Sequence, residues 1–179
     1  MILRFAAKHN ATMKAPPLLP EFVLHRVLRV AQFDGMGVLA VAAFFALASA
    51  SAGDFSGAMI GLLVAAAGAI ELHGTALLRE GETRGMNWLV ASQIFLLVVV
   101  LGYCALRLSN VDLTLLREAM TPELRAMLVQ AGYTEEQFLR MVYRLTYEIF
   151  AVLTVFYQGG MAIYYWRRRE AVVRALSEE

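Results

Sequence analysis

The amino-acid sequence predicts an all-α integral membrane protein with four transmembrane helices. Hydrophobic residues make up 59% of the 179 residues and charged residues only 17%, whereas a soluble domain has about 25% charged residues. The charged residues are also segregated, which leaves four long apolar segments. Each segment approaches the ~20 mostly apolar residues that a helix needs to cross a bilayer. We therefore expect residues 1–179 to form a single membrane domain in a lipid bilayer.

Charge, cysteine content and motifs exclude several classes of protein. A net charge of +1 gives no basic surface for binding nucleic acid. Cys104 is the only cysteine, so the chain has no intrachain disulfide and no CxxC motif. HExxH, GxSxG and phosphate-binding loop motifs are absent, and these are the common signatures of hydrolytic and nucleotide-binding sites. The sequence therefore supplies no catalytic or metal-ligating residues and favours a role other than catalysis.

The N-terminal region predicts an amphipathic helix before the first span. Residues 1–19 are basic and lack the apolar core of a secretory signal, so we expect them to be retained. From Glu21 to Phe33 the polar residues recur at helical spacing, which indicates a helix on the membrane surface or an extension of the first span. Asp34 and the glycines after it interrupt the pattern and predict a helix cap and a bend. The first span then covers residues 35–52.

The second span, residues 57–78, is expected to pack closely against a neighbouring helix. Small residues recur along one of its faces at the spacing that lets two helix backbones approach. These helix-packing residues are Gly57, Gly61, Ala65 and Gly68. Such a face fits another helix of the same chain or a second copy, and we therefore expect a homo-oligomer or a membrane-protein partner.

The second half of the chain predicts two further spans separated by a helical cap. The third span covers residues 87–108 and the fourth residues 143–166. The region between them, residues 109–142, carries helix-start signals at Thr121-Pro122 and at Thr134, where a capping box begins. We expect short amphipathic helices there, outside the membrane, and not an independent domain. The three arginines after Trp166 are expected to end the fourth span.

Basic residues predict the orientation of the bundle. Eleven Lys and Arg residues fall in the N-terminal arm, the turn after the second span and the C-terminal tail, and five fall in or beside residues 109–142. Basic segments next to spans stay on the cytoplasmic side. We therefore expect both termini in the cytoplasm, residues 109–142 on the opposite side, and a bacterial-type inner membrane as the location.

Polar residues within the spans are the candidates for a functional site. An ionisable side chain costs about 2.5–3.5 kcal/mol at the bilayer centre, which makes it a functional candidate. Glu71 is such a residue and borders the small-residue face of the second span. The other candidates for a polar layer or permeation path are His73, Gln93, Gln158, Thr154 and Tyr147. The alternative is that these groups only form hydrogen bonds that hold the helices together.

Glu71 and His73 do not form a ligand pair, because residues two positions apart on a helix point about 200° away from each other. An intramembrane histidine can ligate haem or a pigment, or it can be a hydrogen-bonded packing residue, and we predict no bound cofactor. A second polar network is expected at the far end of the bundle, where an ion pair can also simply anchor helix ends. Its residues are Tyr103, Arg107, Arg144 and Glu148.

Three functions fit these features. The first is a homo-oligomeric channel or transport protein whose permeation path contains Glu71. The second is a subunit or scaffold of a larger membrane complex, without catalysis, in which the same faces serve packing. The third is a haem-, pigment- or quinone-associated membrane protein that uses His73.

Overall fold

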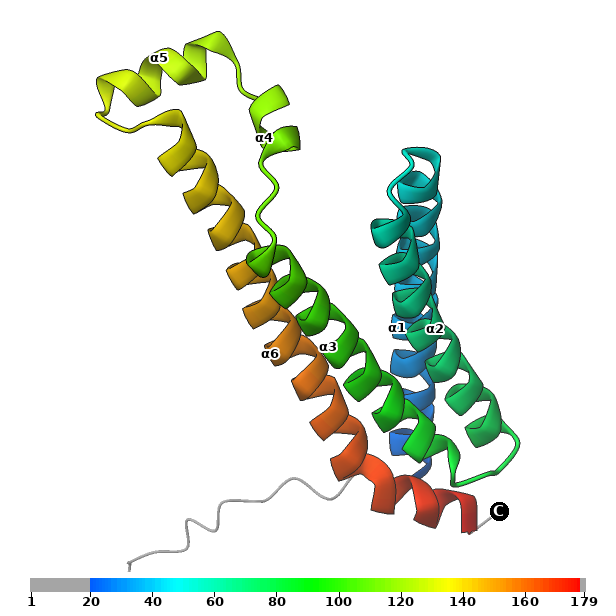
Figure 1. Ribbon diagram of the computed structural model, residues 1–179. Helices are drawn as coiled ribbons and strands as arrows, with labels where there is room; N and C mark the ends of the chain where they lie inside the picture. The colour runs from blue at the N-terminus through cyan, green and yellow to red at the C-terminus, as the bar shows by residue number, and fades with distance from the viewer. Residues whose placement is uncertain (1–19, 178–179) are drawn as a thin grey trace, which may run out of the picture.

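The computed structural model describes residues 20–177 of the chain, which fold into six helices (Figure 1). The helices are α1 (Pro20–Ser51), α2 (Phe55–Arg79), α3 (Gly85–Ser109), α4 (Thr114–Glu118), α5 (Pro122–Gln130) and α6 (Glu135–Ser177). Four of these six, α1, α2, α3 and α6, are long and apolar enough to cross a membrane. The predicted all-α class and the predicted number of spans are therefore confirmed.

Helix α1 is continuous over 32 residues, so the predicted break at Asp34 and the separate N-terminal helix are wrong. Two interactions explain why the helix does not end there. The Asp34 side chain binds groups on α3 and α6 instead of capping its own backbone. Gly35 is buried beside Leu72 and the backbone of Gly68 on α2. The amphipathic residues 21–33 are thus an extension of the first span.

Helices α1 and α2 form a hairpin that packs backbone against backbone. A Cβ atom built on Gly61 would lie 2.7 Å from the Ala46 Cβ, and one built on Gly68 would lie 2.8 Å from the Gly35 carbonyl oxygen. The small-residue face of α2 therefore faces α1 of the same chain. The turn before α2 is fixed by Asp54, whose side chain accepts a hydrogen bond from the Gly57 N–H.

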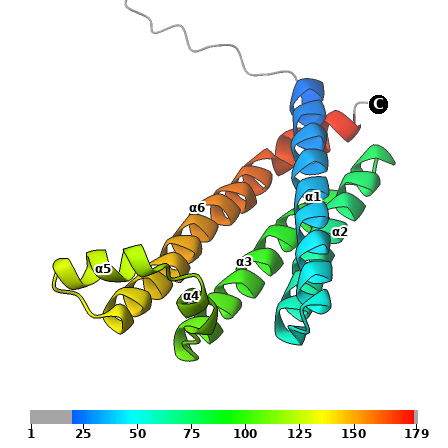
Figure 2. The same cartoon turned by 90° about the horizontal axis from the view of Figure 1, so that it is seen from above.

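The four long helices are arranged as two pairs (Figures 1 and 2). Helices α1 and α2 lie side by side, and so do α3 and α6. The pairs meet at the end that holds the α2–α3 turn, residues 80–84, which we call the closed end. They separate toward the α1–α2 turn, residues 52–54, which we call the open end.

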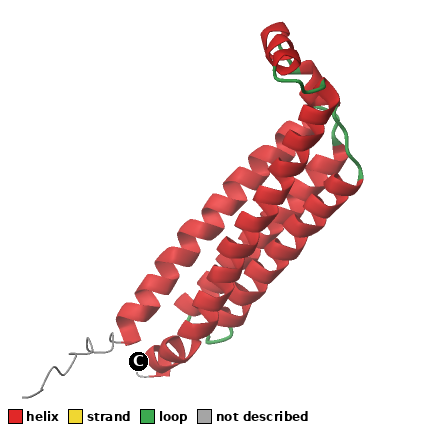
Figure 3. Ribbon diagram, turned by 90° about the vertical axis from the view of Figure 1, so that its left-hand side faces the viewer, coloured by secondary structure: helices red, strands yellow, loops and turns green. Residues whose placement is uncertain are grey.

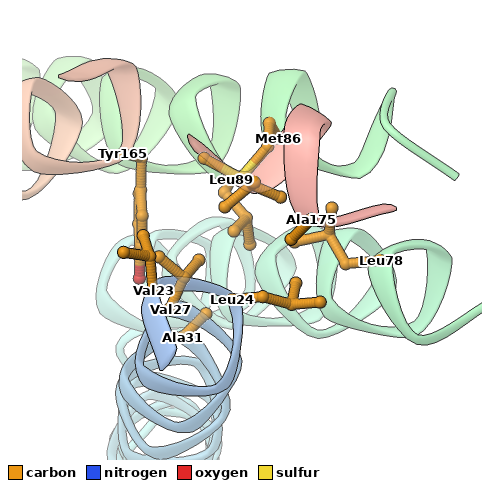
Figure 4. Close-up of a cluster of buried hydrophobic side chains, with 10 residues drawn as sticks. Val23, Leu24, Val27, Ala31, Leu78, Met86, Leu89, Tyr165 and Ala175 are labelled. Atoms are coloured by element: carbon orange, nitrogen blue, oxygen red, sulfur yellow. The ribbon is translucent and has the colours of Figure 1, made fainter. Parts of the chain in front are cut away.

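The closed end contains the main hydrophobic core (Figure 4). Val23 and Val27 of α1 pack there with Leu78 of α2 and Leu89 of α3. Helix α6 continues past its three arginines to Ser177, and its last turns lie across this end of the bundle. Val172 is fully buried in the core. The prediction that the arginines end the fourth helix is therefore wrong, because the apolar residues after them still have a surface to bury against.

The region between α3 and α6 forms the predicted helical cap (Figure 3). Its helices α4 and α5 pack on the start of α6 through a small apolar cluster: Leu113, Met120, Leu128, Leu139 and Tyr143. The predicted capping box is present, because the Thr134 hydroxyl accepts from the Gln137 N–H at 3.3 Å and the Gln137 side chain accepts from the Thr134 N–H at 3.2 Å. Gly132, with φ of 77°, ends the preceding turn as expected.

Candidate functional site

Polar side chains from all four long helices meet at one level of the bundle. Asp34 lies 17 residues before the end of α1 at Ser51, and Glu71 lies 17 residues after Asp54 at the start of α2. At 1.5 Å per residue, both are about 25 Å from the open end. Gln93, 16 residues before the end of α3, lies at nearly the same level. The carboxyl groups therefore sit within the spans, nearer the closed end.

Asp34 is held by groups from two other helices. Its Oδ2 accepts a hydrogen bond from Gln93 Nε2 at 3.1 Å, and its Oδ1 accepts one from the Tyr157 hydroxyl at 2.8 Å. These bonds link α1 to α3 and α6. The Asp34 side chain is half-buried, so it lies between the interior and the space that separates the helix pairs.

Glu71 lies deeper than Asp34 and is 1% exposed. Its Oε1 accepts a hydrogen bond from the Tyr165 hydroxyl at 2.7 Å, and Tyr165 is itself fully buried. The Glu71 carboxyl also interacts with the Asp34 carboxyl and with Gln93. The two acidic side chains thus form a carboxyl pair, one member from α1 and one from α2, with Gln93 beside both.

Two buried amide oxygens near this pair have no hydrogen-bond partner among residues 20–177. They are Oε1 of Gln93, which is 0% exposed, and Oε1 of Gln158, which is 8% exposed. Buried polar atoms in native proteins almost always have a partner. The site therefore has hydrogen-bond acceptors to spare.

A cleft of about 740 Å³ runs between the two helix pairs. Its walls are apolar and include Phe33 and Phe45 of α1 and Phe150 of α6. Four polar residues line its base: Asp34, Thr154, Tyr157 and Gln158. Among the described residues that line the cleft, none is basic. The cleft thus joins an apolar space to one member of the carboxyl pair.

At the open end a charged contact connects the two helix pairs. The Arg107 guanidinium lies 3.7 Å from the Asp54 carboxylate, and its Nε donates to the Tyr103 hydroxyl at 3.0 Å. Tyr103 also lines the cleft. The pKa of Asp54 is lowered from its usual value, mainly because the Ser56 hydroxyl donates to its carboxylate, with further contributions from the Gly57 N–H and from Arg107.

The structure divides the network that was predicted for this end. Tyr103 and Arg107 are together, but Arg107 pairs with Asp54. Arg144 and Glu148 form a separate ion pair at 2.8 Å, one turn apart on the exposed face of α6. Their side chains do not extend the contact between the helix pairs.

The remaining candidates lie in different places. Gln93 and Gln158 belong to the polar level, and Thr154 lines the cleft with its hydroxyl donating to the Phe150 carbonyl at 2.8 Å. Tyr147 is stacked between Tyr103 and Tyr143, nearer the cap. His73 is exposed on α2, with its ring 5.4 Å from that of Trp88 at 82°. His73 therefore does not join the carboxyl pair.

Sequence reasoning missed Asp34, Tyr157 and Tyr165 as site residues. Asp34 was assigned to a helix end, and the two tyrosines lie in a segment that is rich in aromatic residues. One signal could have identified Asp34. In an antiparallel hairpin, residues at equal distances from the turn lie at the same level, and Asp34 and Glu71 are 19 and 18 positions from Gly53.

Together, four helices able to span a membrane and a polar level within them define a small four-span membrane protein with a buried carboxyl pair. No family model, no curated protein and no solved structure matches the chain. The site itself is therefore the only basis for assigning a function.

Proposed function

We propose that this protein is a small membrane transport protein that carries positive charge through the Asp34–Glu71 pair. The observation that supports the proposal is the meeting of two carboxyl groups from different helices inside the spans. Ionisable residues at membrane depth are costly and commonly mark ion pathways and proton relays. Two neighbouring carboxylates repel each other, so one proton or one monovalent cation shared between them lowers the energy of the pair.

The shape of the bundle gives the site unequal access from its two ends. From the open end, the cleft leads to Asp34. From the closed end, the core around Val27, Leu89 and Val172 blocks the way. Transport through one site requires that it face each side in turn. We assign the structure to the state that faces the open end, and a change in the angle between the two helix pairs would reach the other state.

The proposal includes an orientation and an oligomeric state. The distribution of basic residues places the closed end and both termini in the cytoplasm of a bacterial-type inner membrane. All members of the carboxyl pair and its partners come from one chain, so transport needs no second copy. The small-residue face that suggested an oligomer packs against α1. Measuring the mass of the nanodisc-embedded particle tests whether further copies assemble through other faces.

The test is ion flux into proteoliposomes. The purified chain is reconstituted, a potassium diffusion potential is imposed with valinomycin, and proton entry is followed with an internal pH dye. Asp34→Asn and Glu71→Gln each keep an oxygen that can accept the existing hydrogen bonds, but they remove the charge. We expect each variant to lower flux at least about tenfold, as loss of about 1.4 kcal/mol or more of site stabilisation would.

The matched control is Glu148→Gln, which removes a carboxylate from the exposed face of α6. This variant should carry flux at the wild-type rate. Unchanged flux in both Asp34→Asn and Glu71→Gln would exclude the carboxyl pair as the transport site. Absence of flux of protons, Na⁺ and K⁺ in the wild-type protein would exclude transport of inorganic cations.

A further inference from the structure

We propose that the cleft binds a lipophilic organic cation, with the positive group at Asp34 and the apolar part along the walls between the helix pairs. The inference rests on the proposed transport function, because it names the class of substrate that would enter through this cleft. Three separate features of the described residues support it: the charge of the cleft, the direction of its hydrogen bonds and the nature of its walls.

The charge of the cleft selects a cation. Asp34 is the only acidic residue among the described residues that line it, and none of the lining residues is basic. Its nearest charged neighbour is the carboxyl of Glu71, which is also acidic. An anionic ligand would meet only repulsion at this depth, whereas a cation would be attracted by both carboxyl groups.

The direction of the hydrogen bonds selects a ligand that donates or is positively charged. The Tyr157 hydroxyl uses its proton on Asp34, and the Thr154 hydroxyl uses its proton on the Phe150 carbonyl. Both oxygens therefore offer only lone pairs to the cleft. Gln158 Oε1 is buried and has no partner among the described residues. The base of the cleft thus presents acceptors, and an acceptor ligand would leave them unpaired.

The walls select a bulky apolar group. The volume of about 740 Å³ is within the range of ~300–1,000 Å³ found for small-molecule sites. Aromatic rings line the cleft from α1, α3 and α6: Phe33, Phe45, Tyr103, Phe150 and Tyr157. Aromatic faces attract cations, and the attraction increases when the cation is removed from water.

The ligand would enter from the side, out of the bilayer. Phe33 is 70% exposed and Leu153 is 61% exposed, although both line the cleft. Their exposed faces would contact lipid, so the cleft is continuous with the apolar part of the membrane. A lipophilic cation that has partitioned into the bilayer would therefore reach Asp34 without crossing the Arg107–Asp54 contact at the open end.

The test is equilibrium binding of radiolabelled tetraphenylphosphonium to the full-length chain in phosphatidylcholine nanodiscs. We expect saturable binding of one cation per chain. Asp34→Asn should weaken binding at least about tenfold, because the ligand charge loses its buried partner, and Asp34→Glu should restore most of the affinity. Gln158→Leu should weaken binding by about threefold or more, and Asp112→Asn, an exposed loop substitution, should leave it unchanged.

A pair of competing ligands separates charge from apolar bulk. Decyltrimethylammonium should displace the bound cation, and decyldimethylphosphine oxide, which has a similar shape but a neutral acceptor group, should compete at least about tenfold more weakly. Equal competition, or saturable binding that Asp34→Asn leaves intact, would overturn the inference. So would a dimeric particle that binds no cation, since a second copy would then fill the cleft.

The binding and flux experiments can fail separately. Asp34-dependent cation binding in a protein without flux would refute the transport function and keep the binding site. Flux that depends on Asp34 and Glu71, in a protein that does not bind the organic cation, would refute the binding site and keep transport. Each variant is compared with wild type by size-exclusion chromatography before either measurement, so that misfolding is not read as loss of binding.

Discussion

Tyr165 provides the direct hydrogen bond that holds Glu71 inside the bundle. Its hydroxyl is 2.7 Å from the carboxyl oxygen, and both side chains are almost completely buried. A buried polar group that loses its partner costs about 1–3 kcal/mol. The position of the carboxyl pair therefore depends on one residue of α6 that lies 94 positions away in the chain.

Tyr165→Phe should lower the free energy of unfolding by about 1–3 kcal/mol, because it leaves the Glu71 carboxyl without its hydroxyl donor. Denaturation in mixed detergent micelles, followed by tryptophan fluorescence, measures the change. Tyr164→Phe is the control, since the Tyr164 hydroxyl is buried without a partner among the described residues and its removal should not destabilise the protein. An equal loss in both variants would mean that the hydrogen bond to Glu71 contributes nothing.

At the scale of elements, glycine contacts set how closely α1 and α2 can lie. Gly61 and Gly68 of α2 place their Cα atoms directly against the α1 backbone, where a side chain has no room. In a membrane, such close contact provides the dispersion energy that holds helices together, because lipid already solvates their apolar side chains. The hairpin is thus specified by the absence of side chains at particular positions.

Gly68→Ala should destabilise the hairpin by about 1–3 kcal/mol, since its Cβ would lie 2.8 Å from the Gly35 carbonyl oxygen and 2.9 Å from the Leu39 nitrogen. The matched substitution is Gly102→Ala on α3, whose Cβ would meet nothing within 4 Å. That variant should be as stable as wild type or slightly more stable. The same detergent titration compares the two, and a similar stability for both would refute the packing account.

The start of α2 should be sensitive to acid. The pKa of Asp54 is lowered in the folded protein because Ser56 and the Gly57 N–H donate to its carboxylate. Its stabilising effect is therefore complete above the unfolded pKa of ~3.9 and is lost as the pH falls through the lower folded value.

Asp54→Asn tests this directly, because asparagine is an equally good helix cap but does not titrate in this range. The difference in unfolding free energy between wild type and variant should shift against wild type between about pH 5 and pH 2. A difference that stays constant over this range would show that the Asp54 charge does not stabilise the fold.

At the scale of the whole molecule, two helix pairs are joined firmly at one end and weakly at the other. The closed end has a buried apolar core. At the open end the contact between Arg107 and Asp54 spans the pairs at 3.7 Å, with both side chains partly exposed. An exposed ion pair contributes less than about 1 kcal/mol. The angle between the pairs is therefore the softest coordinate of the bundle.

Arg107→Gln should broaden the distribution of distances between the pairs at the open end. Spin labels at exposed positions Leu47 on α1 and Ile149 on α6, in a Cys104→Ser background, allow the distances to be measured by pulsed electron resonance. Arg144→Gln removes an arginine that pairs only within α6 and should leave the distribution unchanged. A distribution that is equally narrow in both variants would show that the ion pair does not restrain the opening.

The sequence alone determined the class of the protein, because span length and charge segregation depend on local composition. The four spans, the helical cap with its Thr134 capping box, and the small-residue face of α2 all followed from residues close together in the chain. Glu71 and the two glutamines could also be selected, since a polar group inside an apolar segment needs no tertiary information to be recognised.

Only the tertiary structure decided which residues meet. Asp34 reads locally as a helix cap, and its role changed because Gln93 and Tyr157 come to it from α3 and α6. Arg107 was expected to join Arg144 and Glu148, and it pairs with Asp54 instead because the α1–α2 turn lies opposite the end of α3. The cleft exists because the two helix pairs diverge, and divergence depends on packing angles to which every residue in the interface contributes.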